Sequence, residues 1–239
     1  MRKDHRPYYI KQLYLRFQKL YGTHFIKPQL QSLGPGATFM KPWHVEIFGG
    51  PIHIGKYATI IASSDKKVRI SVWPGQPGKG AIQIGDYCML CPGVRISAAD
   101  GIHIGDSCMF ANNAFVTDSD WHGIYNRVST GKADPITIAD NVWIGDSAII
   151  CKGVSIGKNS IVGAGAVVTG DIPADVIAAG NPAKVVKRLD PGKPVTTRAH
   201  WLGEPRRLFR DFDRYDRATL KHNSLLTWIR HLVSPSNNS

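Results

Sequence analysis

The chain is poor in cysteine and has no long apolar run. Among its 239 residues are four cysteines, Cys88, Cys91, Cys108 and Cys151, too few and too unevenly spread for the disulfide framework of a small secreted domain. No apolar stretch reaches the roughly eighteen residues of a transmembrane helix, and the N-terminus lacks the apolar centre of a secretory signal. We therefore expect a cytoplasmic protein without disulfides.

Acidic residues are also scarce, and their shortage is local. The sequence holds 30 Lys and Arg against 18 Asp and Glu, a net charge of +12. Residues 1–28 carry +6 and residues 183–239 carry +7, whereas residues 29–182 carry −1. Basic ends suit coenzyme phosphates, an acidic carrier protein, an anionic membrane surface or nucleic acid, and they also occur as plain solvated surface. Of these partners we expect coenzyme phosphates and a peripheral membrane contact, and no nucleic acid.

The centre of the chain repeats with a period of six residues. One column of the repeat holds branched aliphatic residues: Ile138, Ile144, Ile150, Ile156, Val162 and Val168. A second column holds small or β-branched residues: Val142, Ala148, Val154, Ser160 and Ala166. A helix has a period of 3.6 and a single strand a period of 2, so this spacing predicts a stacked β-solenoid.

Each hexad is expected to form one short strand and one corner, and three hexads to close a triangular coil. Coils stack at the inter-strand spacing of about 4.8 Å, with both columns pointing into the prism. Gly145, Gly157 and Gly163 follow the aliphatic residue, where we expect a sharp turn. Cys88 and Cys108 occupy the small inward position and Cys91 and Cys151 a corner, so the repeat explains all four cysteines without a metal or redox role.

Three regions follow from this pattern. The solenoid is expected over residues 52–188, with loops leaving it at about 63–82 and 117–137. Residues 1–51 form an N-terminal arm, in which residues 8–21 read as an amphipathic helix that caps the solenoid or lies on a membrane, followed by a loop-rich lead-in. Residues 189–239 form a basic extension with one or two amphipathic helices between 205 and 233.

The hexads and the closing stretch IGKNSIVGAGAVVTGDIPADVIAAGNPAKVVKR resemble the hexapeptide-repeat acyltransferases, the family of galactoside, maltose and xenobiotic acetyltransferases. The resemblance covers about residues 52–188 and does not reach the arms. It implies an all-β core folded as a left-handed parallel β-helix, which is an exception to the right-handed crossover rule. It also implies a homotrimer with acetyl-CoA bound in the cleft between neighbouring solenoids.

The resemblance places a catalytic histidine at His122, in the loop sequence DSDWHG. Imidazole titrates near neutrality, so it can take a proton from an acceptor and return one to the departing thiolate. Asp118 or Asp120 could orient its second nitrogen, or be merely solvated. Asn113 is another candidate polar contact, or a corner residue bonded to its own backbone. Trp121 and Arg127 could shape the acceptor pocket.

The resemblance also maps a coenzyme channel. Trp143, Asp146, Ala164 and Thr169 match positions that line the pantetheine arm, and Lys184, Lys187 and Arg188 match basic positions that meet the nucleotide phosphates. Gly170 replaces a lysine common in the family. On the acceptor side, Cys91 and either Ala99 or Asp100 stand where galactoside enzymes have a sugar-binding Asn and Asp, which disfavours a galactoside.

We therefore predict an acetyl-CoA-dependent O- or N-acetyltransferase that acts on a sugar or sugar-containing precursor of a surface polysaccharide or lipopolysaccharide. Donation from an acyl carrier protein is an alternative, and so is a non-catalytic trimeric scaffold. A zinc carbonic anhydrase is disfavoured because the position five before His122 is Thr117 rather than a second histidine. We expect no metal.

Overall fold

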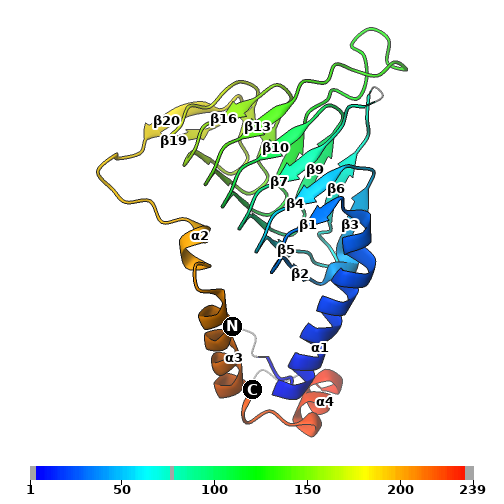
Figure 1. Cartoon of the computed structure of the whole chain (residues 1–239), viewed down its shortest axis with the longest axis vertical. Coiled ribbons are helices and arrows are strands. Elements are labelled where there is room, and N and C mark those ends of the chain that lie inside the picture. The colour runs from blue at the N-terminus through cyan, green and yellow to red at the C-terminus, as the bar shows by residue number, and fades with distance from the viewer. Residues whose placement is uncertain (1–3, 76–77, 235–239) are drawn as a thin grey trace.

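The strands of the chain form the walls of a triangular prism, with helical arms below it (Figure 1). The computed structural model describes residues 4–75 and 78–234. Residues 1–3 of the N-terminal arm, 76–77 of the first expected loop and 235–239 of the C-terminal extension lie outside the described residues. The fold is a left-handed parallel β-helix, as expected.

Each wall is one sheet, and successive strands of the chain pass from wall to wall. The first wall contains β1 (Ser32–Leu33), β4 (Ile52–Ile54), β7 (Ile82–Ile84), β10 (Ile102–Ile104), β13 (Ile136–Ile138) and β16 (Ser155–Ile156). The second contains β2 (Thr38–Met40), β5 (Thr59–Ile61), β8 (Met89–Leu90), β11 (Met109–Phe110), β14 (Trp143–Ile144), β17 (Ile161–Val162), β19 (Val176–Ala179) and β20 (Lys184–Arg188). The third contains β3 (Val45–Phe48), β6 (Val68–Val72), β9 (Arg95–Ala98), β12 (Phe115–Thr117), β15 (Ile149–Ile150) and β18 (Val167–Val168).

The two columns of the repeat form the core. Ile138, Ile144 and Ile150 are fully buried, one on each wall of the same coil. Pairing between successive coils is parallel and in register, with Ile102 opposite Ile136 and Ile104 opposite Ile138, so equal side chains stack along the prism. Because no coil can bury these side chains alone, the repeats stabilise one another. This confirms the hexad interpretation.

The glycines of the repeat serve close packing between coils. A Cβ on Gly145 would lie 2.6 Å from the backbone nitrogen of Ala164 in the next coil. The left-handed backbone conformation falls two residues later, at Ser147, where φ is 58°. The expected sharp turn is therefore present, but the glycine is required by the approach of the next coil rather than by its own φ.

Two expected boundaries were wrong. The solenoid begins before residue 52, because β1, β2 and β3 already form a complete coil. The first loop is shorter than 63–82, because β6 (Val68–Val72) pairs with β3 and β9 in the third wall. In the five residues of β6 buried positions alternate with more accessible ones, so its period of two obscures the six-residue period. The first loop proper therefore begins after β6 and ends before β7.

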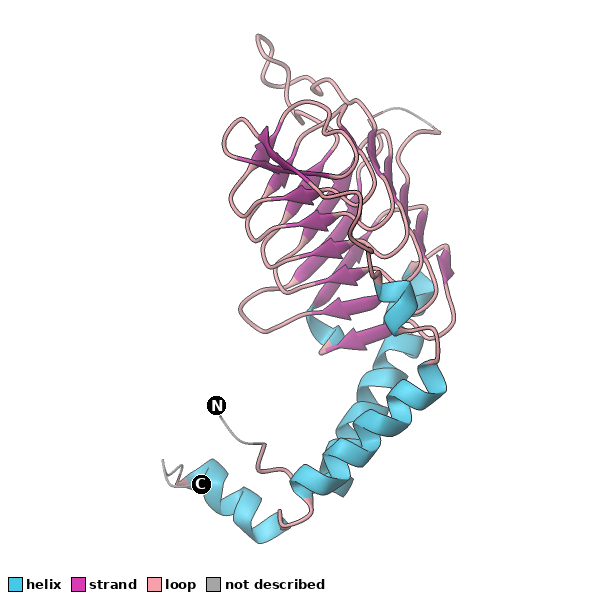
Figure 2. Ribbon diagram, turned by 90° about the vertical axis from the view of Figure 1, so that its left-hand side faces the viewer, coloured by secondary structure: helices cyan, strands magenta, loops and turns pink. Residues whose placement is uncertain are grey.

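The arms come together at the end of the molecule away from the solenoid (Figure 2). Helix α1 (Tyr8–Tyr21) is where the sequence predicted it, and the extension contains α2 (Arg198–Trp201), α3 (Pro205–Leu220) and α4 (Leu225–Val233). The shorter helical turns are η1 (Gly22–Ile26), η2 (Lys27–Gln29) and η3 (Pro42–His44). Tyr8 donates a hydrogen bond to Asp213 at 2.5 Å, and this contact joins α1 to α3.

The helices of the arms are all short or polar. Over residues 4–75 and 78–234, none combines the length and the apolarity that crossing a bilayer demands.

Candidate functional site

The second loop is an ordered hairpin that leaves the edge between the third and first walls (Figure 1). It connects β12 to β13 and runs over residues 118–135, within the expected range of about 117–137. The backbone N–H of Asp120 donates to the carbonyl of Lys132 at 3.1 Å, and that of Asp134 donates to the carbonyl of Asp118 at 2.9 Å. These bonds hold the residues around His122 on a defined base.

His122 is exposed and its ring is oriented by a backbone group. Nδ1 of His122 lies 3.0 Å from the carbonyl oxygen of Arg127. A carbonyl oxygen only accepts, so Nδ1 carries the proton in the neutral ring and Nε2 keeps a free lone pair. The backbone N–H of His122 also donates to the carbonyl of Asp120 at 2.8 Å. The loop therefore presents the tautomer that a general base requires.

The carboxylate of Asp118 is used elsewhere. It is fully buried and accepts backbone N–H bonds from Ala99 at 2.6 Å, Asp100 at 2.9 Å and Gly101 at 2.7 Å. Burial raises the pKa of Asp118, and the three N–H donors act in the opposite direction. Asp118 thus fastens the base of the second loop to the corner of the preceding coil.

Asp120 faces the following coil. Both of its carboxylate oxygens lie 2.6 Å from Nζ of Lys152, in the corner after β15. In the described residues neither Asp118 nor Asp120 contacts the ring of His122. The group that orients the ring is the backbone carbonyl of Arg127. Every residue has a backbone carbonyl, so the sequence does not indicate which one contacts the ring. Arg127 itself donates from Nε to the carbonyl of Ile124 at 2.9 Å.

A largely apolar pocket of about 240 Å³ lies between the two loops. Its lining residues come from the first loop, the corner after β9 and the second loop: Trp73, Pro74, Gly75, Ala99, Ser119, Trp121, Thr130, Gly131 and Ala133. Nε1 of Trp121 donates to Oγ1 of Thr117 at 2.9 Å, which fixes the indole. Trp73 stacks on Phe48 with ring centroids 4.0 Å apart. No role for Trp73 follows from the sequence, because only the fold brings the two loops together.

The expected coenzyme residues lie mainly on another edge, between the second and third walls. Trp143 is 46% exposed on the second wall. Asp146 and Ala164 occupy successive corners, where the N–H of Gly165 donates to the carbonyl of Asp146 at 2.7 Å. Asn113 lies on this edge too, with φ of 59°, and the strand β12 separates it from the second loop. One chain therefore does not bring Asn113 to His122.

The remaining expected residues are at the closing end of the solenoid. Thr169 and Gly170 follow β18 and are exposed, on the edge from which the second loop leaves. Lys184, Lys187 and Arg188 are exposed on β20, which pairs antiparallel with β19. Their ammonium and guanidinium groups are free to meet an anionic ligand.

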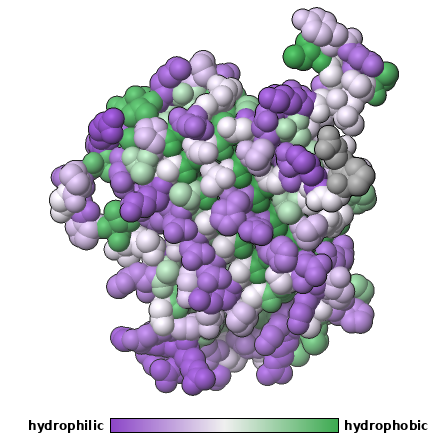
Figure 3. All heavy atoms as spheres, turned by 45° about the horizontal axis from the view of Figure 1, so that its top comes forward, coloured by the Kyte–Doolittle hydropathy of each residue, from purple (hydrophilic) through white to green (hydrophobic). Residues whose placement is uncertain are grey.

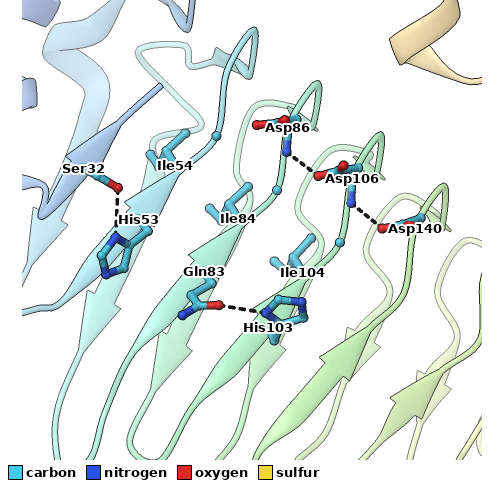
Figure 4. A pocket seen from close by; sticks show the side chains of 13 residues that line it. Ser32, His53, Ile54, Gln83, Ile84, Asp86, His103, Ile104, Asp106 and Asp140 are labelled. Atoms are coloured by element: carbon cyan, nitrogen blue, oxygen red, sulfur yellow. Dashed lines mark hydrogen bonds between the residues drawn. The ribbon is translucent and has the colours of Figure 1, made fainter. Parts of the chain in front are cut away.

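A different hollow, of about 450 Å³, runs along the first wall (Figure 4). There the N–H of Asp86 donates to Asp106 at 2.7 Å, and the N–H of Asp106 donates to Asp140 at 2.7 Å. These carboxylates hold successive coils together. Nowhere in the described ranges do three His, Cys, Asp or Glu side chains gather closely enough to ligate a metal ion.

Comparisons with known proteins agree with this architecture. Residues 135–170 match the family described as bacterial transferase hexapeptide (six repeats), and residues 81–118 match the hexapeptide repeat of succinyl-transferase. These two segments of the solenoid are thus similar to hexapeptide-repeat proteins. More particularly, the relatives that match are acetyltransferases with this repeat, so the solenoid resembles the hexapeptide-repeat acetyltransferases.

Two known proteins illustrate the similarity. The chain is 42% identical over 91 residues to the galactoside O-acetyltransferase of Escherichia coli, across 37% of this chain and 45% of that protein. The chain spans less than half the length of the first curated relatives that it matches, 33%, 45% and 27%. The solved structure of AntD, an N-acyltransferase from Bacillus cereus in complex with dTDP and coenzyme A, covers 81% of this chain and 95% of its own with a TM-score of 0.54. At 20% identity it shows the fold alone.

Proposed function

We propose that the protein is an acetyltransferase that moves an acetyl group from acetyl-CoA to a hydroxyl or amine of a sugar-type acceptor. The observation that carries the proposal is the orientation of His122, whose Nδ1 faces the Arg127 carbonyl at 3.0 Å and leaves Nε2 as the basic atom. The galactoside O-acetyltransferase among the relatives supports the reaction class.

In the proposed reaction His122 acts as base and then as acid. Nε2 removes the proton from the acceptor O–H or N–H as that atom attacks the thioester carbonyl. The new C–O or C–N bond forms, the C–S bond breaks, and the imidazolium returns its proton to the departing thiolate. No acyl-enzyme is required. Backbone N–H groups are the proposed donors to the negatively charged oxygen that develops in between.

For the donor we propose the exposed residues of the second wall and of β20. Trp143 offers an aromatic surface for the pantetheine arm, and the small side chain of Ala164 lets that arm approach the backbone. Lys184, Lys187 and Arg188 supply positive charge for the phosphates. Asp146 extends this channel on the same edge, and Thr169 and Gly170, on the edge of the second loop, would join it from the neighbouring chain.

We propose a homotrimer, because one chain separates the parts of this site. The second loop projects from the body (Figure 3), and its tip carries Ile124, Tyr125 and Val128 with exposures of 72%, 99% and 94%. Apolar side chains this exposed, beside the proposed catalytic residue, suit coverage by a neighbouring solenoid. The edge with Trp143 and Ala164 on the neighbour would then bring the donor to His122.

On the acceptor side we propose that Trp121 and Trp73 of the inter-loop pocket contact the substrate. Aromatic side chains with flanking hydroxyls such as Ser119 suit a ring with one apolar face. We propose a cytoplasmic enzyme of surface polysaccharide or lipopolysaccharide assembly, held near the membrane through its basic arms. The described residues favour no specific carrier protein as donor.

Calorimetric titration with acetyl-CoA tests the donor. Saturable binding, weakened in Lys184→Ala/Lys187→Ala, is expected.

Transfer of radiolabelled acetyl groups to a panel of sugars then tests His122. His122→Ala should lower kcat by roughly 10²- to 10⁴-fold, since this is the contribution of a general base. His103→Ala is the matched control, because His103 is also exposed but lies on the first wall, beside Gln83. Equal transfer by both variants, or no coenzyme binding, would overturn the proposal.

A further inference from the structure

Helix α4 presents its apolar face to solvent. Its nine residues begin with a capping box in which Ser224 and Thr227 bond reciprocally. The exposed apolar residues fall within an arc of about 120°, at 100° per residue. They are Leu225 (43% exposed), Leu226 (80%), Ile229 (46%), Leu232 (62%) and Val233 (81%), and the half-buried Trp228 lies just outside the arc. A helix of a globular protein normally buries such a face.

The polar side of α4 is the side that attaches it to the protein. His231 stacks on His5 with ring centroids 3.7 Å apart. Asn223, just before the helix, donates to the carbonyl of Asp4 at 2.7 Å and to that of Arg6 at 3.0 Å. These contacts fix α4 to the N-terminal segment and turn its apolar face outward. These contacts between the two ends of the chain therefore set the orientation of α4.

The surroundings of this face are positively charged. The sequence from Arg217 to the C-terminus contains no Asp or Glu. Nearby acids are already paired, Asp213 with Arg217 at 2.8 Å and Asp216 with Lys11 at 2.7 Å. In the described part of the chain, Lys221 and Arg230 form no ion pair. Arg230 flanks the apolar arc by helical position.

An exposed apolar helix face with basic flanks matches the interfacial region of an anionic bilayer, where apolar side chains enter the acyl boundary and cations meet the headgroups. We infer that α4 docks the protein on anionic lipid membranes through Leu226, Ile229 and Leu232. This deepens the membrane contact proposed above by naming its element. α4 lies at the opposite end of the longest axis from the second loop (Figure 1), so docking leaves the loop facing away from the lipid.

Co-sedimentation of the full chain with vesicles tests this inference. Binding is expected to vesicles of phosphatidylcholine mixed with phosphatidylglycerol, to be weak on phosphatidylcholine alone, and to fall as salt is raised. Leu226→Ser/Leu232→Ser should weaken binding by about tenfold or more, because two large apolar side chains are lost from the interface. Leu13→Ser/Leu20→Ser is the matched control, since these leucines of α1, in the other basic arm, are 57% and 68% exposed. It should stay within about twofold, because the inference assigns the membrane contact to α4 and not to both arms.

Three results would overturn the inference. The first is that the protein binds neither kind of vesicle, and the second is an equal loss of binding in both variants. The third is a smaller assembly of Leu226→Ser/Leu232→Ser in sedimentation velocity, which would assign the face to contact between copies. Acetyl transfer to a soluble acceptor should be unchanged in Leu226→Ser/Leu232→Ser. Acetyl transfer is therefore measured independently of membrane binding, so the proposed function and the membrane inference can fail separately.

Discussion

The backbone N–H of Gly101 donates to the buried carboxylate of Asp118 at 2.7 Å, across the corner that follows β9. This corner lies between the two loops. On its other side, the N–H of Trp73 donates to the carbonyl of Ala98 at 2.7 Å and that of Gly80 to the carbonyl of Asp100 at 2.9 Å. One carboxylate therefore sets the position of the second loop relative to the first, and with it the pocket between them.

Replacing Asp118 by Asn should lower both stability and acetyl transfer. The amide has one oxygen in place of two, and its NH₂ group would face backbone N–H donors that now lack a partner. An unsatisfied buried donor costs about 1–3 kcal/mol. Chemical denaturation and steady-state kinetics measure the two effects.

Asp106→Asn is the control for this change. Asp106 accepts the backbone N–H of Asp86 at 2.7 Å, a bond of the same kind on an edge without loops. It should lose some stability but keep kcat. A fall in kcat of the same size in both variants would show that Asp118 acts on the solenoid as a whole and does not position the loop.

The titration of Asp118 should also be visible in the pH dependence of stability. Burial raises its pKa above the ordinary value of 3.8, so the folded protein holds this proton more tightly than the unfolded chain. The group then stabilises the fold most below pH 3.8, and that contribution is lost as the pH rises through the raised pKa. The unfolding free energy of the wild type minus that of Asp118→Asn should therefore decrease between these two pKa values. A difference that is flat or rises with pH would contradict it.

The solenoid could be predicted because each coil needs the same kind of side chain at the same position of the repeat. Ile138, Ile144 and Ile150 differ by six positions and meet equivalent surroundings, so the spacing carries the fold. β6 (Val68–Val72) was not predicted, because its alternating pattern is that of a longer strand and not of a hexad. Its place depends on pairing with β3 and β9, which only the stacked coils supply.

The candidate site could be predicted only in part. The hairpin with His122 follows from the interruption of the hexads, but the partner of its ring is a carbonyl, which every residue possesses. Asp118 and Asp120 were reasonable partners by sequence distance. In the structure Asp118 is buried and accepts a hydrogen bond from the backbone N–H of Ala99, and Asp120 forms an ion pair with Lys152 in the next coil.

Gly131 should be intolerant of a side chain. A Cβ there would lie 2.6 Å from the carbonyl oxygen of His122 and 2.8 Å from Cβ of Asp120, so the two sides of the hairpin would have to separate. We expect Gly131→Ala to reduce kcat at least about tenfold through displacement of His122, since misplacement of reacting groups by 1 Å costs up to about a hundredfold.

Gly101→Ala provides the comparison for that variant, because a Cβ on Gly101 meets no atom within 4 Å. It should keep nearly full activity. Coenzyme titration should give wild-type affinity for both variants, since neither glycine belongs to the proposed donor channel. Full activity of Gly131→Ala would mean that the position of the hairpin around His122 does not limit the reaction.

Arg198 anchors the C-terminal extension to the second wall, and its loss should free the arm without melting the solenoid. Nε of Arg198 donates to the carbonyl of Tyr87 at 2.7 Å, and a terminal nitrogen reaches Oγ1 of Thr59 at 3.1 Å. Lysine lacks the planar fork needed for both contacts, so Arg198→Lys should not preserve them. Limited trypsin digestion should release residues beyond 198 several-fold faster in this variant, while the solenoid keeps its Tm. Arg214→Lys is the control, because Arg214 lies exposed on α3 and forms an ion pair with Asp211 of the same helix at 3.5 Å. Equal digestion of both variants would locate the anchor instead in the contact of α3 with α1.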